Sequence, residues 1–159
     1  MRRVIVLAAV AVWLAVGATA TEAQVRRPSL QTSFGCTVSA TSVNFGQYDP
    51  LSSVPDETQG SISYSCDVTK YRVTIEISSG NNGRFDREMR GADALKYNLF
   101  LDANCQTVWG DGSHGTQKLV DNYPASDHRY TVPVYGRIPA RQDVRAGSYS
   151  DRLVVTMQW

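Results

Sequence analysis

The final stretch of the chain, residues 149–159 (YSDRLVVTMQW), decides the fold class. Apolar side chains recur there at every second position, and polar side chains fill most of the positions between them. Such alternation is typical of a β-strand that buries one face and exposes the other. The residues that share the buried face are Tyr149, Leu153, Val155, Met157 and Trp159, and Asp151 interrupts them. We therefore predict a strand that runs to the last residue.

The same alternation recurs upstream. We expect further strands over residues 36–40, 62–66, 71–77, 95–101 and 130–134, and a continuation through Val43 and Phe45 after a bulge at 41–42. Turn-forming residues at 79–83 and 109–115 separate these strands. Pro133 cannot donate a ladder hydrogen bond, so its strand should have an edge position or a bulge there. Residues 86–95 could hold one helical turn. The six or seven short strands predict an all-β antiparallel sandwich.

The composition limits the classes of protein to which the chain can belong. Of its 159 residues, 42% are hydrophobic and 19% are charged, which excludes a disordered chain. The formal net charge of +1 argues against a nucleic-acid-binding protein, which normally carries a clear basic excess. The length fits one domain with a hydrophobic core.

The first 23 residues have the features of a secretory signal peptide. A short basic start precedes an apolar run over 4–18, and residues 18–20 and 21–23 each offer a small-x-small cleavage pattern. The alternative is a membrane anchor, but the apolar run is shorter than the roughly 20 residues that span a bilayer. We expect residues 1–23 to be removed and the protein to be exported.

Cleavage after Ala23 would leave a neutral chain, with fourteen basic and fourteen acidic side chains. We expect this chain to consist of an N-terminal extension over residues 24–35 and one β-sandwich domain over residues 36–159. No later segment is long and apolar enough to form a transmembrane helix. Export also places the domain in a compartment that permits disulfides.

The three cysteines allow at most one disulfide within the chain. Cys36 and Cys66 lie on neighbouring expected strands, and a bridge between them would close a loop of about 31 residues. We favour this pairing, and pairings that involve Cys105 stay open. A Cys105 that is unpaired within the chain would be a partly buried bystander or, in the alternative, a reactive thiol or one half of an intermolecular bridge.

The sequence contains no recognisable catalytic, cofactor-binding or metal-binding motif, so we expect a protein that is not an enzyme and needs no cofactor. His114 lies near Asp111 in a glycine-rich turn, but loop histidines are usually solvated. Trp109 and Tyr97 could form a stacking platform for a sugar, although aromatic residues beside turns more often serve packing. Three regularly spaced arginines fit a solvated stripe: Arg84, Arg87 and Arg90.

Several motifs together resemble the spore coat protein U family, which includes pilin subunits of the archaic chaperone–usher pathway. Each motif alone is weak, but their order along residues 36–159 is specific. The motifs are CTVSA at 36–40, VNFGQYDP at 43–50, ISYSC at 62–66, the stretch 83–89, LKYNLF at 95–100, VWGDG at 108–112, YGRI at 135–138 and the end at 146–159.

The resemblance implies an incomplete immunoglobulin-like sandwich that lacks its last strand. In the family, a periplasmic chaperone fills the resulting groove, and at the outer-membrane usher the N-terminal segment of the next subunit replaces it. By resemblance, the groove would be lined by Val43, Phe45, Leu153, Val155, Met157 and Trp159, whose alternative role is core packing. A candidate donor segment precedes Cys36, with Leu30, Thr32 and Phe34 in phase.

The resemblance therefore implies a structural subunit of a surface pilus, with roles in adhesion and biofilm formation. Its expected partners are a periplasmic chaperone, an outer-membrane usher and like subunits, in the periplasm first and then at the cell surface. One alternative is a secreted coat protein of a spore or cyst from the same family. A second alternative is a secreted carbohydrate-binding module that uses Trp109.

Overall fold

The computed structural model of the protein describes residues 3–9, 35–67 and 71–159. These residues form strands and connecting loops, and the prediction of an all-β fold is confirmed. The strands in chain order are β1 (Arg3–Ala9), β2 (Cys36–Ala40), β3 (Asp56–Cys66), β4 (Arg72–Ile77), β5 (Glu88–Arg90), β6 (Ala94–Lys96), β7 (Asn98–Phe100), β8 (Leu119–Asn122), β9 (Arg129–Ile138) and β10 (Arg152–Gln158). Within the described ranges there is no helix of a length and hydropathy that would cross a membrane.

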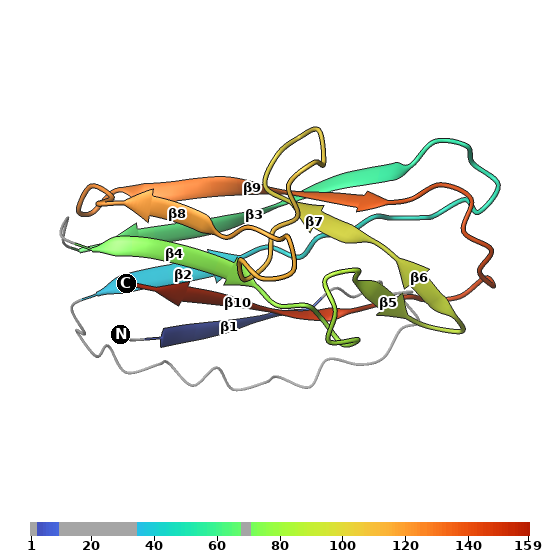
Figure 1. Ribbon diagram of the computed structural model, residues 1–159, viewed down its shortest axis with the longest axis horizontal. Helices are drawn as coiled ribbons and strands as arrows, with labels where there is room; N and C mark the ends of the chain where they lie inside the picture. The colour runs from blue at the N-terminus through green and yellow to red at the C-terminus, as the bar shows by residue number, and fades with distance from the viewer. Residues whose placement is uncertain (1–2, 10–34, 68–70) are drawn as a thin grey trace, which may run out of the picture.

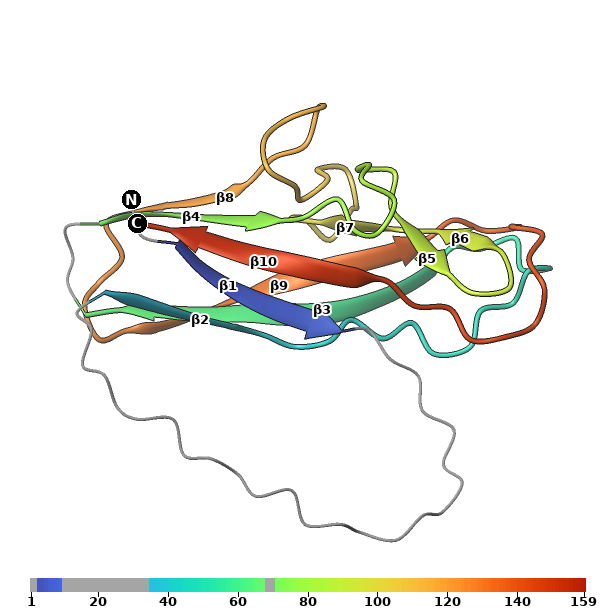
Figure 2. The same ribbon diagram turned by 90° about the horizontal axis from the view of Figure 1, so that it is seen from below.

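Two four-stranded antiparallel sheets make up the sandwich (Figure 1). The first sheet has the order β1-β10-β4-β8 and the second β2-β3-β9-β7, while β5 and β6 pair as a separate hairpin. Figure 2 shows β1 lying beside β10 and close to β2, along one side of the sandwich. β1 lies within the expected signal peptide over residues 1–23, and without β1 the strand β10 is an edge strand of its sheet.

The last strand forms as its alternation predicts. Leu153, Val155 and Met157 are buried, whereas Arg152 is exposed and Thr156 is half-buried on the outer face. The buried residues of β10 pack in one core with apolar side chains from both sheets, among them Ile62 and Tyr64 of β3, Val73, Ile75 and Ile77 of β4, and Val134 and Ile138 of β9.

The strand expected over residues 95–101 is divided in the structure, because the chain changes its pairing partner within it. The alternation over 95–101 predicts one strand, but β6 pairs with β5 and β7 pairs with β9. Leu95, Tyr97 and Leu99 are all buried, so the side-chain pattern continues while the hydrogen-bonding partner changes. The helical turn considered for residues 86–95 is wrong, because this segment forms the β5–β6 hairpin.

The expected strand through Val43 and Phe45 is also wrong, because β2 ends at Ala40 and the next residues have no regular pairing. Thr41 makes the last backbone bond, from its N–H to the Ser61 carbonyl at 2.9 Å. The short strand β8 was not expected, since its side chains are at most half-buried and give little alternation.

Pro133 occupies the edge position that its chemistry predicts. Its partner in β3 is Ser61. The Ser61 N–H donates to Thr41 Oγ1 and the Ser61 carbonyl accepts from the Thr41 N–H, so both backbone groups of Ser61 point away from β9. The Pro133–Ser61 pair is therefore of the kind without mutual hydrogen bonds, and no ladder bond is lost. On the other side of β9, β7 pairs only with residues 135–137.

The expectation of a solvated arginine stripe is wrong at its centre. Arg84 and Arg90 are exposed, but Arg87 is completely buried because it shares the inward parity of Met89 two residues later. Burial lowers the pKa of Arg87 to about 10, which still leaves it charged at neutral pH. Its guanidinium donates hydrogen bonds of 2.6–3.2 Å to the carbonyls of Ile77, Ser78 and Trp109 and to Oδ1 of Asn98.

Candidate functional site: the outer edge of strand β10

The backbone of β10 offers a second edge for pairing on the side away from β4. Val154 points its backbone groups toward Ser78, which follows β4. Its carbonyl accepts a hydrogen bond from the Ser78 N–H, and its N–H donates one to Ser78 Oγ, each at 2.9 Å. Since successive residues of a strand point their backbone groups to opposite sides, Leu153, Val155 and Met157 direct theirs to the other edge. In the structure β1 pairs antiparallel there, from Arg3 opposite Gln158 to Ala9 opposite Arg152.

The same three residues direct their side chains into the core. With β1 in place, Leu153 is 5%, Val155 3% and Met157 0% exposed. Because β1 also contacts β2 of the other sheet, it closes the side of the sandwich between the two sheet edges. A strand at this position thus extends the backbone ladder of β10, and its removal would leave an unpaired edge beside the apolar side chains of β10.

Trp159 follows β10 and lies at one end of the predicted groove. The indole of Trp159 lies over Gly35, where the Cβ atom of any larger residue would come within 3.2 Å of the ring and push it away. The N–H of Gly35 donates to Asp67 Oδ2 at 2.8 Å. Next to this contact, Cys36 and Cys66 are directly opposite in the β2–β3 ladder and form the disulfide. The favoured pairing is confirmed.

Toward the other end, Val43 and Phe45 pack against glycines of the second sheet. Val43 lies over Gly60 and Phe45 over Gly136, where the absence of a Cβ atom makes room for them. Phe45 also meets the ring of Tyr97 edge to face, with centroids 6.0 Å apart. Glycine at these two positions lets the chain after β2 reach the core although it forms no strand.

Asp151 explains the interruption in the alternation of the last strand. It is 3% exposed, and its carboxylate accepts hydrogen bonds from the Tyr97 hydroxyl at 2.8 Å, the Asn81 N–H at 2.9 Å and the Arg152 N–H at 2.8 Å. A buried carboxylate is tolerated when donors surround it. Sequence reasoning missed Asp151 and Tyr97 as a pair because only the fold brings them together.

The predicted groove residues fall into three groups in the structure. Leu153, Val155 and Met157 lie on β10 under β1, whereas Val43 and Phe45 approach from the other sheet and Trp159 lies at one end. All six belong to the core or pack against it. The candidate donor residues Leu30, Thr32 and Phe34 lie outside the described residues, as does the expected cleavage site.

The aromatic residues considered as a sugar platform cannot serve that role. Trp109 is completely buried and its indole N–H donates to the Ile75 carbonyl at 3.0 Å. Tyr97 is 4% exposed and is engaged by Asp151. The carbohydrate-binding alternative that rests on Trp109 is therefore wrong.

The remaining candidates have structural surroundings. Cys105 is a free, buried thiol, and burial raises its pKa, which favours the unreactive protonated form. His114 is exposed, and its Nδ1 lies 2.8 Å from Ser113 Oγ. Across the described part of the chain, no three His, Cys, Asp or Glu side chains are grouped to hold a metal ion.

Comparisons with known proteins agree with this architecture. Residues 20–156 match the Spore Coat Protein U domain. The chain is 30% identical over 140 residues to Protein U of Myxococcus xanthus, covering 79% of this chain and 75% of that protein. It is similar, with a TM-score of 0.54 and 21% identity, to one chain in the crystal structure of the CsuC-CsuE chaperone-tip adhesion subunit pre-assembly complex from archaic chaperone-usher Csu pili of Acinetobacter baumannii.

The structural likeness covers 78% of this chain but spans 39% of the chain that it matches, so it speaks for the fold of one domain. That fold is the incomplete immunoglobulin-like sandwich that the sequence predicts. The family match covers nearly the whole chain and includes every strand from β2 to β9 and most of β10. The chain belongs to the Spore Coat Protein U domain family.

Proposed function

We propose that this chain is a structural, non-enzymatic subunit of a surface pilus, exported through the periplasm and completed at the β10 edge by a strand from another chain. The observation that carries the proposal is the pairing at that edge, where an added strand extends the first sheet and contacts β2 of the second. The relative in Acinetobacter baumannii was crystallised with a chaperone. By analogy, a periplasmic chaperone would occupy the edge first, and a like subunit would replace it at an outer-membrane usher.

Chain length supports donation to a neighbour over folding back onto the same domain. The extension over 24–35 joins the domain at Gly35, beside Trp159 and the end of β10. A strand in the direction of β1 starts at the Trp159 end of β10 and runs to the Arg152 end. The extension would therefore have to cover this length twice, once as the strand and once to return to Gly35. The seven residues of β1 cover about 23 Å at ~3.3 Å per residue, so the round trip needs about fourteen residues. With cleavage after Ala23 the extension has only twelve residues, so donation to a neighbour is favoured for that cleavage site.

The register of β1 against β10 also predicts which side chains a donor strand needs. Residues directly opposite in an antiparallel pair share one face of the sheet. Alternate residues of the donor would therefore lie beside Leu153, Val155 and Met157, and each buried apolar side chain would contribute about 1.5–3 kcal/mol. In the extension, Leu30, Thr32 and Phe34 have this spacing, with two apolar positions around one threonine.

The proposal is tested by co-expression with a periplasmic pilus chaperone and by electrophoresis of unheated samples, in which strand-exchanged polymers survive SDS. We expect the wild-type chain to form a ladder. A variant without residues 24–35 should form a stable complex with the chaperone but no ladder, because its groove is intact and its donor is absent.

A matched pair of substitutions separates the groove from the rest of β10. Val155→Lys places a charge on the core face, and we expect it to abolish both the chaperone complex and the ladder. Thr156→Lys changes the adjacent residue on the outer face and should behave as wild type. A ladder from the deletion variant equal to that of wild type, or a wild-type chain that stays a stable monomer, would overturn the proposal.

A coat protein of a spore or cyst is the second candidate. The family name and the 30% identity to Protein U of Myxococcus xanthus favour it. Such a protein would use the same fold in an assembly that does not require an usher. If ladders form at the cell surface with the usher gene deleted, the coat assignment replaces the pilus; if they require the usher, the pilus assignment holds.

A further inference from the structure

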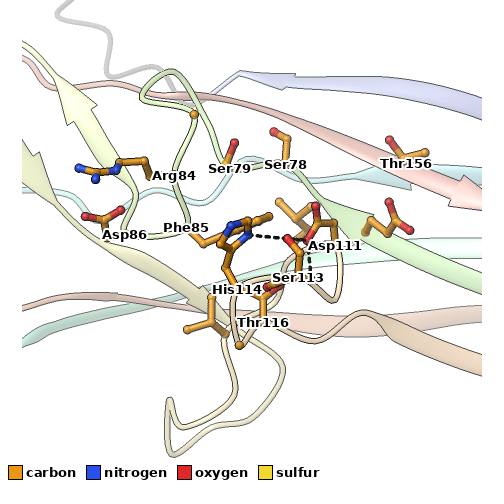
Figure 3. Close-up of a pocket in the computed structure, with 15 residues that line it drawn as sticks. Ser78, Ser79, Arg84, Phe85, Asp86, Asp111, Ser113, His114, Thr116 and Thr156 are labelled. Atoms are coloured by element: carbon orange, nitrogen blue, oxygen red, sulfur yellow. Dashed lines mark hydrogen bonds between the residues drawn. The ribbon is translucent and has the colours of Figure 1, made fainter.

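A cavity of about 900 Å³ with a mixed polar and apolar lining opens on the outer face of the first sheet, away from the predicted groove. Its floor includes Glu76 of β4 and Thr156 of β10, and the loops over 79–86 and 108–116 form its walls (Figure 3). Because Thr156 points outward while Val155 and Met157 point into the core, the cavity and the groove lie on opposite faces of β10. The volume is within the ~300–1,000 Å³ typical of ligand sites.

The walls of this cavity are held by the buried Arg87. Its guanidinium bonds to the end of β4 through the carbonyls of Ile77 and Ser78, and to the second wall through the carbonyl of Trp109. It also lies 5.4 Å from the centre of the Phe85 ring. A buried charge is costly unless it is well bonded, so this arrangement fixes both loops and one face of Phe85.

Phe85 and His114 form an aromatic corner in the cavity. Their ring centroids are 6.4 Å apart with planes tilted by 36°. Figure 3 shows the imidazole beside Phe85, with Ser113 and Asp111 on its other side. His114 is at φ 49°, between Gly112 at 85° and Gly115 at 79°, so the turn directs this side chain through a left-handed backbone.

A chain of hydrogen bonds fixes which imidazole nitrogen carries the proton. The hydroxyl of Ser113 donates to Asp111 Oδ1 at 2.6 Å. Its single proton is thereby used, so the contact of 2.8 Å with His114 must be a donation from Nδ1–H to Ser113 Oγ. The Nε2 atom of the neutral ring is left as an acceptor. Hydrogen bonds from Ser113 lower the pKa of Asp111 and keep its carboxylate ionised.

The charges around the cavity select the class of ligand. Three carboxylates, of Glu76, Asp86 and Asp111, are balanced by three cations: Arg84 in the lining, Lys118, which pairs with Glu76 at 3.1 Å, and the buried Arg87 behind Phe85. This balance of charge favours a neutral ligand over an anion or a cation. Hydroxyl groups can both donate to carboxylates and Nε2 and accept from serine and threonine, while the half-exposed Phe85 offers apolar surface to C–H groups.

We infer that this cavity binds a neutral saccharide, with Phe85 and His114 as its principal contacts. The inference does not depend on strand donation, because the cavity is formed by residues on the outer face of the sheet. A fibre or coat built from such subunits would then display one sugar site per copy.

The test uses the full chain and saturation-transfer NMR, with neutral mono- and disaccharides of glucose, galactose, mannose and N-acetylglucosamine as probes at millimolar concentration. We expect at least one of them to bind, and we expect His114→Ala and Phe85→Ala each to weaken binding about tenfold or more. His128→Ala is the matched control, since His128 is also an exposed histidine against an aromatic ring, Tyr130, but lies outside the cavity.

His114 is exposed although its φ is positive, so we expect its substitution to lower the melting temperature only slightly, and melting curves of both variants check that the fold is kept. The inference is overturned if none of the probes binds to the wild-type chain, or if His114→Ala binds as wild type. Stronger binding of an anionic sugar such as glucuronate than of every neutral probe would overturn the assignment of ligand class.

Discussion

The Tyr97 hydroxyl donates a hydrogen bond of 2.8 Å to Asp151 Oδ2, and both side chains are almost completely buried. This bond joins the point where the chain passes from β6 to β7 with the residue that precedes β10. Because Asp151 also accepts from the Asn81 N–H, it fixes the turn after β4 and the start of the last strand together. The β10 edge is thus positioned by a buried polar pair.

Replacement of Tyr97 by phenylalanine should therefore destabilise the domain. The change removes one hydrogen bond to a charged group in a buried site, a loss of about 1.5–3 kcal/mol in the free energy of unfolding. Urea denaturation followed by tryptophan fluorescence measures it. Tyr123→Phe is the control, because Tyr123 is 66% exposed and its loss should stay within about 0.5 kcal/mol. Equal effects of the two substitutions would contradict this account.

Replacement of Arg87 by methionine should lower the free energy of unfolding more than Tyr97→Phe does. The substitution keeps a long apolar side chain but leaves the buried carbonyls of Ile77, Ser78 and Trp109 without this donor, and we expect a loss of about 3–5 kcal/mol. Arg87→Lys should recover little, since an ammonium group cannot reproduce the planar fork. The exposed Arg84 and Arg90 provide controls by substitution with alanine. Comparable stability of Arg87→Met and Arg84→Ala would show that the buried network contributes nothing.

Removal of the disulfide should weaken the domain through its unfolded state. Cys36 and Cys66 are separated by 30 residues, and the double serine variant should lose about 3.5–4 kcal/mol. Cys105→Ala, which leaves the bridge intact, should cost much less. Thermal unfolding with and without reductant distinguishes them: reductant should lower the melting temperature of wild type and of Cys105→Ala but not of the double variant.

The raised pKa of Cys105 predicts slow chemistry at this thiol. At a pH of about 8 a raised pKa leaves less thiolate than in an unfolded chain, and only the thiolate is alkylated. Iodoacetamide should therefore modify native Cys105 more slowly than the same thiol in urea, after correction for the denaturant. Modification of the native protein at the unfolded rate would restore the interpretation of Cys105 as a reactive thiol.

Asp102 should contribute to the dependence of stability on pH. It accepts hydrogen bonds from the N–H groups of Gln106 and Thr107, and these lower its pKa below the ordinary value of 3.8. A carboxylate with a lowered pKa in the folded state stabilises it at pH above the unfolded value, and the contribution is lost as pH falls through the folded value. Asp102→Asn should thus reduce the difference in urea midpoint between neutral pH and pH about 3. If Asp102→Asn leaves the difference in urea midpoint between the two pH values unchanged, the lowered pKa of Asp102 does not contribute to stability.

The sequence predicted those parts of the fold in which local pattern and burial agree. The alternation over 149–159 corresponds to β10, and the inward parity of Leu95, Tyr97 and Leu99 is correct. It did not predict that this stretch divides between two pairing partners, because side-chain parity is the same whichever strand supplies the hydrogen bonds. The strand expected through Val43 failed for the same reason, since apolar alternation shows burial and not pairing.

The sequence predicted the burial of the candidate site residues but not the strand edge that they form. The six groove residues are apolar and follow a strand period, so sequence alone placed them at the core. Sequence could not show that Leu153, Val155 and Met157 direct backbone groups to an edge that takes an additional strand, because an edge is defined by what is absent beside it.

The amino-acid sequence by itself determined that the protein is all β, that its last apolar alternation forms a strand, and that Cys36 favours Cys66. These features depend on local periodicity and on the chemistry of single residues. Only the tertiary structure decided that Arg87 is buried, that Asp151 receives Tyr97, and that His114 meets Phe85 in an outer cavity. Such contacts join residues far apart in the chain, and polar side chains reveal their burial only when the fold supplies their partners.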